Sequence, residues 1–125
     1  MARLSNILRS QAGGRVAWWC PGCDAPHAIT VEGPSAWTWD RNAETPTFSP
    51  SVLTTGTRMT VEGEAMLARG ESPTDGRYPS VETRCHSFMK GGQMEFLSDC
   101  THALAGQTVP ISRWPESFGD GDFDV

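Results

Sequence analysis

Lysine is nearly absent from this sequence, because nine of the ten basic residues are arginine, scattered from Arg3 to Arg113 without a run. The chain also lacks an apolar run of membrane length, a secretory signal and an internal repeat. These absences argue against a membrane-spanning helix and favour a cytoplasmic protein with reduced thiols. A net charge of −5 without a basic cluster also argues against nucleic acid as a partner, because phosphate binding needs gathered Lys and Arg.

Long helical patterns are scarce as well. Leu4, Ile7 and Leu8 have helical spacing, but Gly13 and Gly14 end the pattern, so residues 1–14 are expected to form a short helix or an extended arm. Thirteen Gly, nine Pro and five Trp favour short strands and turns. We therefore predict a mainly β fold with minor helix, a small single domain over residues 1–125 that a metal would help to stabilise.

Two stretches are predicted to lie outside the sheet. Residues 62–78 are rich in Gly, Pro, Ser and charge, which is typical of a long exposed loop with at most one helical turn. Residues 114–125 form an acidic tail in which Asp120, Asp122 and Asp124 alternate with Gly and Phe. Such a tail is expected to be solvated or bound to a partner.

The sequence Cys20-Pro-Gly-Cys23 is the clearest chemical signal in the chain. A gap of two residues with Pro and Gly in the turn aims two thiolates at one tetrahedral zinc ion. A redox pair of the thioredoxin type would need a helix after the first Cys, and Pro26 interrupts such a helix. We therefore predict a ribbon-like metal corner between a strand that ends at Trp19 and one that begins at His27.

Residues 85–102 are predicted to contain a β-hairpin that turns at Gly91 and Gly92. Strand parity then places Cys85 and Cys100 on one face and His86 on the other. One structural zinc ion held by Cys20, Cys23, Cys85 and Cys100 is the favoured site. Two alternatives remain: His86 or His102 replaces one of the later cysteines, or Cys85 and Cys100 are ordinary buried thiols.

Histidines and one carboxylate surround the expected ligands. His86, Asp99 and His102 could bind a catalytic metal or perform acid/base chemistry. We favour a supporting role, in which these groups and His27 hold metal ligands and loop ends by hydrogen bonds. The reason is that we identify no activated nucleophile in the sequence.

Aromatic residues are the candidates for a binding surface, because Trp and Arg often anchor protein interfaces. A domain of short strands cannot bury all its tryptophans, so some are expected at the surface. The residues that we assign to this interaction surface are Trp37, Trp39, Arg41, Phe118 and Phe123.

A set of motifs lies between residues 18 and 111: Cys20-Pro-Gly-Cys23 with His27, Trp37-Thr-Trp39, Pro46-Thr-Phe-Ser-Pro-Ser51, Cys85-His-Ser-Phe88 and Asp99-Cys-Thr-His-Ala-Leu-Ala-Gly-Gln107. Together they resemble an uncharacterised family of small tailed-phage and prophage proteins. Many members are labelled ammonia monooxygenase, which does not suit this chain because that enzyme is an integral membrane copper protein. The resemblance implies a phage-encoded protein in the cytoplasm of the infected bacterium or in the virion.

The function that follows from these observations is a non-enzymatic protein-interaction module with a structural zinc ion. Its partner would be a host or phage protein, in host takeover, in countering host defence or as a virion accessory. The alternative is a small metal-dependent hydrolase that uses His86, Asp99 and His102. A closed thiolate site favours the first reading, since it leaves the metal no open position for substrate.

Overall fold

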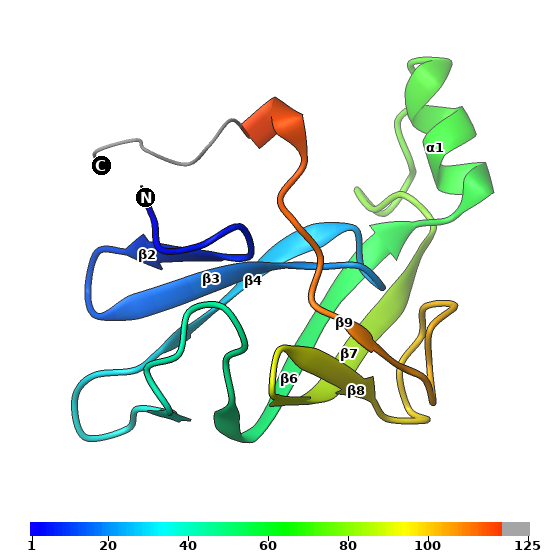
Figure 1. Ribbon diagram of the computed structural model, residues 1–125. Coiled ribbons are helices and arrows are strands. Elements are labelled where there is room, and N and C mark those ends of the chain that lie inside the picture. The colour runs from blue at the N-terminus through cyan, green and yellow to red at the C-terminus, as the bar shows by residue number, and fades with distance from the viewer. Residues whose placement is uncertain (119–125) are drawn as a thin grey trace.

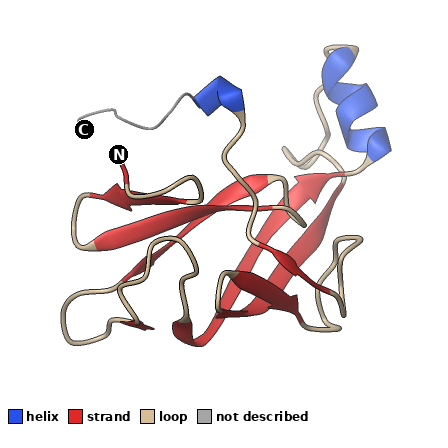
Figure 2. Ribbon diagram, viewed as in Figure 1, coloured by secondary structure: helices blue, strands red, loops and turns tan. Residues whose placement is uncertain are grey.

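The computed structural model describes residues 1–118 and confirms the mainly β prediction, because two antiparallel sheets make up most of the fold (Figures 1 and 2). The first sheet contains four strands and the second contains five. In the described part, no helix is long and apolar enough to cross a membrane.

The first sheet has its strands in the order of the chain: β1 (Ala2–Arg3), β2 (Leu8–Gln11), β3 (Arg15–Cys20) and β4 (Ala25–Thr30). Residues 1–14 thus form β1 and β2, not the short helix considered above. Leu8 is fully buried and pairs with Trp18, whereas Leu4 is 40% exposed, so the helical stripe is not used. Pairing with β3 decides the local structure, because it satisfies backbone groups that a short isolated helix would leave in water.

The second sheet also follows chain order: β5 (Thr38–Trp39), β6 (Phe48–Met59), β7 (Ser80–Lys90), β8 (Gln93–Phe96) and β9 (Thr108–Pro110). The hairpin of β7 and β8 turns at Gly91 and Gly92, both with positive φ, and Lys90 faces Gln93 as predicted. Strand β8 ends at Phe96, earlier than expected, so the segment that carries Cys100 is a turn and not a strand.

Two short helices complete the described chain. Helix α1 (Val61–Ala68) occupies the first part of the expected loop and projects beyond the ends of β6 and β7 (Figure 1). The Thr60 side chain caps it by accepting a hydrogen bond from the Gly63 amide. The 3₁₀ helix η1 (Glu116–Phe118) lies in the predicted acidic tail. Phe123 lies outside the described residues.

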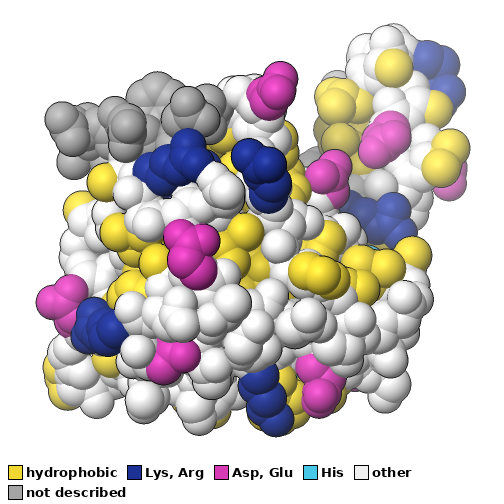
Figure 3. All heavy atoms as spheres, viewed as in Figure 1, with side chains coloured by type: hydrophobic (Ala, Val, Ile, Leu, Met, Phe, Trp, Pro, Cys, Tyr) yellow, Lys and Arg dark blue, Asp and Glu magenta, His cyan; other side chains and the backbone are white. Residues whose placement is uncertain are grey.

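The core lies between the two sheets and is rich in aromatic and sulfur-containing side chains. Trp18 and Phe48 stack with ring centroids 5.8 Å apart, and Trp39 stacks on the other side of Phe48 at 5.9 Å. A second cluster forms where Trp114 and Phe118 pack on Trp19. Figure 3 shows basic and acidic side chains interleaved over one face, with a band of hydrophobic side chains across its middle.

Candidate functional site

A bulge in β6 determines where the Ser51 side chain lies. Phe48 pairs with Met89 and the next regular pair is Val52 with Ser87, so residues 49–51 stand opposite Phe88 alone. Past the bulge, Leu53 is directly opposite His86. Residues opposite each other in antiparallel strands share a face, as do residues two apart, so Ser51 and His86 share the outer face of the sheet.

Ser51, His86 and Asp99 form a continuous hydrogen-bonded chain on that face. The Ser51 Oγ atom lies 3.0 Å from His86 Nε2, and His86 Nδ1 lies 3.3 Å from Asp99 Oδ2. Ser51 and His86 are half-buried, and the Asp99 side chain is 39% exposed. A hydroxyl beside an imidazole that a carboxylate orients is the arrangement that activates a serine as a nucleophile.

Neighbouring side chains contact Ser51 and Asp99, the two residues at the ends of this hydrogen-bonded series. The Trp37 indole Nε1–H donates to the Ser51 carbonyl at 3.3 Å and so braces the backbone of the bulge. Arg84 Nη1 lies 3.7 Å from Asp99 Oδ2, close enough for a solvent-screened electrostatic attraction.

Cys20, Cys23, Cys85 and His102 form a second cluster, in which the four possible ligand atoms all lie within 4.8 Å of one another. Cys20 is the last residue of β3 and Cys23 lies in the turn between β3 and β4, while Cys85 comes from β7 and His102 from the segment after β8. The Cys20 and Cys85 sulfurs are 3.8 Å apart. That distance matches the edge of a tetrahedron whose arms are about 2.3 Å, the usual Zn–S length.

The turn between β3 and β4 positions the candidate metal ligands of this cluster. Asp24 takes a positive φ of 53° and its amide donates to the Cys20 carbonyl, while the Cys23 amide donates to the Cys20 sulfur at 3.4 Å. Gly22 lies so close to His102 that a Cβ there would stand 2.3 Å from ring atom Cε1. Glycine is therefore required at position 22 for the ring of His102 to reach the cysteines.

Without a metal, the cluster holds one thiolate. The hydrogen bond from Cys85, with help from the His27 imidazole, lowers the pKa of Cys20 to about 4 despite its burial. Burial and the nearby Cys20 charge raise the pKa of Cys23 to about 11. The pKa of Cys85 is also raised, because its proton is held by Cys20 and its sulfur is buried.

The imidazole of His102 has an unused ring nitrogen next to the sulfurs. Its Nε2 atom is buried without a hydrogen-bond partner among the described residues, whereas the Leu104 amide donates to Nδ1 at 3.2 Å. A buried polar atom without a partner is costly unless something else binds it. Three sulfurs and one imidazole suit zinc. A neutral imidazole that binds a metal through one nitrogen carries its proton on the other, so neither nitrogen could still accept from the Leu104 amide.

The structure separates residues that the sequence analysis grouped together. Cys20, Cys23 and Cys85 converge, but His102 takes the fourth place where Cys100 was preferred. The Cys100 sulfur instead contacts the backbone of His86. His86, the other alternate ligand, points to the opposite face of β7.

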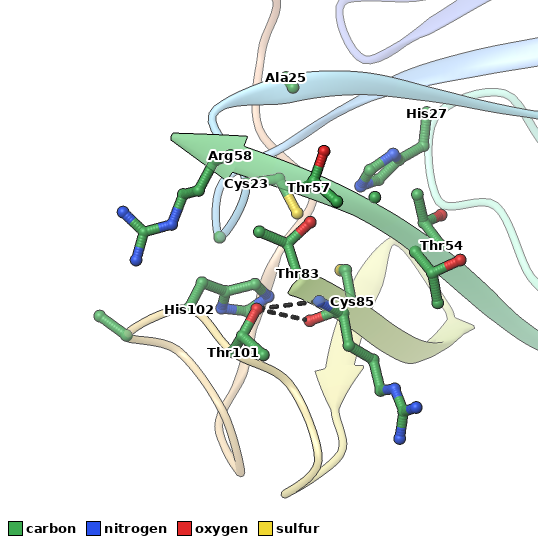
Figure 4. A pocket seen from close by; sticks show the side chains of 15 residues that line it. Cys23, Ala25, His27, Thr54, Thr57, Arg58, Thr83, Cys85, Thr101 and His102 are labelled. Carbon is green, nitrogen blue, oxygen red and sulfur yellow. Dashed lines mark hydrogen bonds between the residues drawn. The ribbon is translucent and has the colours of Figure 1, made fainter. Parts of the chain in front are cut away.

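His27 and the described residues of the expected interaction surface lie in different parts of the fold. His27 lines the cavity beside the cysteines and contacts Trp18 edge to face (Figure 4). Trp37 and Trp39 are half-buried against the core, and Arg41 lies over the Trp39 ring. Phe118 is 38% exposed and packs on Trp19.

Two cavities flank β6 and β7. The larger, of about 610 Å³, is lined by three residues of the cysteine–histidine cluster; Figure 4 shows Cys23, Cys85 and His102 around it. The smaller, of about 490 Å³, starts at Asp99 and runs along the outer face of the two strands. Its lining is polar: Thr55, Gly56, Thr57, Glu82, Thr83, Arg84, Asp99 and Thr101. This second cavity adjoins the Ser51–His86–Asp99 chain.

Ser51 is the candidate functional residue that sequence reasoning missed. It stands in the Pro46-Thr-Phe-Ser-Pro-Ser51 motif, alongside motifs that contain His86 and Asp99. A Ser, His and Asp each in a separate motif could have suggested a catalytic triad, but their contact depends on pairing between distant strands. The structure supplies that pairing.

Comparison with known proteins gives one match. A family model described as bacterial ubiquitination-like system serine protease (BubE) matches residues 3–97, about three quarters of the chain. No curated protein and no solved structure matches the chain.

The family match overturns the prediction of a non-enzymatic phage interaction module. The metal-dependent hydrolase is set aside too, because His86 and Asp99 contact Ser51 while His102 joins the cysteines. The chain belongs to the family of serine proteases of bacterial ubiquitination-like systems.

Proposed function

We propose that this protein is a serine protease whose nucleophile is Ser51, whose general base is His86 and whose orienting carboxylate is Asp99. The observation that carries the proposal is the hydrogen-bonded chain of 3.0 and 3.3 Å through these three side chains. The family description supports the same chemistry. That description also leads us to propose a protein substrate within a bacterial ubiquitination-like system, in the cytoplasm.

The geometry gives each residue a defined role. Ser51 Oγ attacks the carbonyl carbon of the scissile bond while His86 Nε2 takes the hydroxyl proton. His86 then gives this proton to the leaving amine, and an acyl group remains on Ser51 Oγ. A water molecule, deprotonated by His86, hydrolyses that ester and regenerates the serine. Asp99 accepts the His86 Nδ1–H, which fixes the tautomer and stabilises the imidazolium.

The metal cluster has a different proposed role, as a structural zinc site. Cys20, Cys23, Cys85 and His102 would fill all four tetrahedral positions, which leaves no place for substrate or water on the ion. When bound, zinc would therefore contribute stability to the fold and not chemistry to the reaction. The site lies on the opposite face of β7 from His86.

The polar cavity that starts at Asp99 is the proposed substrate groove. It lies on the same sheet face as Ser51 and follows β6 and β7, a shape that suits an extended peptide. Leu53 lies opposite His86 and is 55% exposed, so it offers an apolar contact next to the nucleophile. These features support a polypeptide substrate.

Labelling with diisopropyl fluorophosphate tests the proposed nucleophile. The reagent should phosphorylate Ser51 Oγ with loss of fluoride, and mass spectrometry of the digested protein should locate the label there. Ser51→Ala should abolish labelling, and His86→Ala should slow it by at least about 100-fold, in line with the contribution of a general base. Ser49→Ala, which changes an exposed serine two residues away, is the matched control and should label like the wild type. Unchanged labelling of Ser51→Ala would exclude this nucleophile.

A further inference from the structure

The segment after β8 continues along β7 without forming a strand. Ladder pairing between β7 and β8 stops at Ser87 and Phe96. Beyond that point the Leu97 amide donates to the His86 carbonyl, and the Thr101 amide donates to the Arg84 carbonyl, both at 2.9 Å. Residues 97–101 therefore stay attached to the edge of β7 although their backbone is a turn.

Two side chains supply further contacts along this edge. The Cys100 sulfur accepts from the His86 amide and donates to the His86 carbonyl, both at 3.2 Å. The Thr101 hydroxyl does the same at Arg84, accepting from the amide at 2.9 Å and donating to the carbonyl at 3.3 Å, as the dashed lines in Figure 4 show. Each side chain thus imitates the paired hydrogen bonds of a β-ladder.

Asp99 immediately precedes these two anchors. The Asp99 side chain is 39% exposed. Its Oδ2 atom lies 3.3 Å from His86 Nδ1 and 3.7 Å from Arg84 Nη1. A carboxylate exposed to this extent has more than one rotamer available, so burial alone does not fix the rotamer that faces His86. The backbone to which Asp99 belongs must therefore be held in place from elsewhere, and Cys100 is the adjacent buried anchor.

We infer that Cys100 and Thr101 are positioning residues, which place Asp99 against His86 by extending the β7 ladder with their side chains. The inference rests on the proposed serine-protease function. It also gives Cys100 a role other than metal binding, in keeping with its place outside the cluster of Cys20, Cys23, Cys85 and His102.

Matched variants of each anchor test the inference. Thr101→Val keeps the side-chain volume and removes the hydrogen bonds. Cys100→Val removes them with the addition of one heavy atom, whereas Cys100→Ser keeps a donor and an acceptor. The rate of labelling by diisopropyl fluorophosphate should fall about 10- to 100-fold in the two valine variants, the size expected for a catalytic group displaced by about an ångström. Cys100→Ser should recover most of the rate.

Two readouts separate positioning from a general structural role. The proton NMR signal of His86 Nδ1–H should lie far downfield when bonded to Asp99, and should weaken or shift in both valine variants as in Asp99→Asn. The zinc content of Cys100→Val should equal that of the wild type. If Cys100→Val does not fold, Thr101→Val still provides the test.

The possible failures are distinguishable. Wild-type labelling rates and an unchanged downfield signal in both valine variants, with Ser51→Ala unreactive, would overturn the positioning role and leave the protease function intact. Loss of zinc from Cys100→Val would show that Cys100 is a ligand, which also overturns the inference. Labelling of Ser51→Ala like the wild type would instead overturn the function on which the inference rests.

Discussion

Gly22 shows how one residue without a side chain can control a metal site. Replacement by Ala would put a Cβ 2.3 to 2.6 Å from three atoms of the His102 ring, so the ring must move away from the cysteines. We expect Gly22→Ala to weaken zinc binding by about 10- to 100-fold, as other disturbances of ligand orientation do. A competition titration against a chromophoric zinc chelator measures this.

Gly56→Ala is the control for that substitution. Gly56 lies in β6, and a Cβ added there would meet only Thr83 Oγ1, at 3.4 Å. This variant should bind zinc like the wild type. Equal affinity of the Gly22→Ala protein would mean that His102 is not a ligand.

The thiol pKa values predict how zinc binding depends on pH. The pKa of Cys20 is lowered to about 4, so this sulfur is already a thiolate at neutral pH, while the raised pKa values of Cys23 and Cys85 keep both protonated. Zinc must therefore displace about two protons, and its affinity should rise as the pH rises. Calorimetric titration at pH 7 in buffers of different ionisation enthalpy should report about two protons released per ion. Release of none would contradict the thiol states described here.

Residue spacing predicted three members of the candidate metal site and left the fourth open, with Cys100 preferred and His86 or His102 as alternates. The two-residue gap between Cys20 and Cys23 and the hairpin parity at Cys85 are local patterns, and the structure brings these three together. The parity argument failed to carry to Cys100 because β8 ends at Phe96, and alternation has no meaning in the turn that follows. His102 reaches the cysteines through that turn.

At the scale of elements, turn chemistry was predictable, but the register between strands distant in sequence was not. Gly91 and Gly92 set the hairpin register because both adopt positive φ, which glycine tolerates. The bulge that raises Ser51 toward His86 depends on where β6 meets β7, some 35 residues apart along the chain. No local pattern encodes that meeting point, so nothing in the sequence distinguished Ser51, the proposed nucleophile, from the other serines.

The groove along β6 and β7 gives a prediction at the same scale. Thr57 is exposed and lines the cavity that begins at Asp99, away from the three reacting side chains. Thr57→Trp should fill this space and slow cleavage of a mixed peptide library by about tenfold, the effect of losing roughly 1.4 kcal/mol of substrate binding. Labelling by diisopropyl fluorophosphate, which is too small to need the groove, should not change.

Thr108→Trp provides the comparison, because it adds the same bulk to an exposed position on β9. Peptide cleavage by this variant should match the wild type. If Thr57→Trp also cleaves the library at the wild-type rate, the peptide does not occupy this cavity.

At the scale of the whole molecule, the metal cluster connects parts that are distant in sequence. Cys20 ends β3 of the first sheet, Cys23 lies in the turn that follows, and Cys85 lies in β7 of the second sheet, 65 residues after Cys20. An isolated β-bridge pairs Trp19 of β3 with Ser112, which follows β9. An ion that binds all four side chains would close a long loop, which is where a cross-link reduces the entropy of the unfolded chain most.

Removal of the metal should therefore affect the entire fold. Structural zinc binding contributes on the order of 10 kcal/mol in small zinc-dependent domains, which is as large as the whole usual margin of stability of about 5–15 kcal/mol. We expect a strong chelator to lower the melting temperature sharply or unfold the protein, and to abolish labelling of Ser51, because Cys85 and His86 are neighbours on β7. Circular dichroism melting curves with metal analysis before and after chelation measure this, and added zinc should restore both properties. A protein that has lost its metal yet melts and labels as before would show that the two sheets hold together, and hold the triad, without the ion.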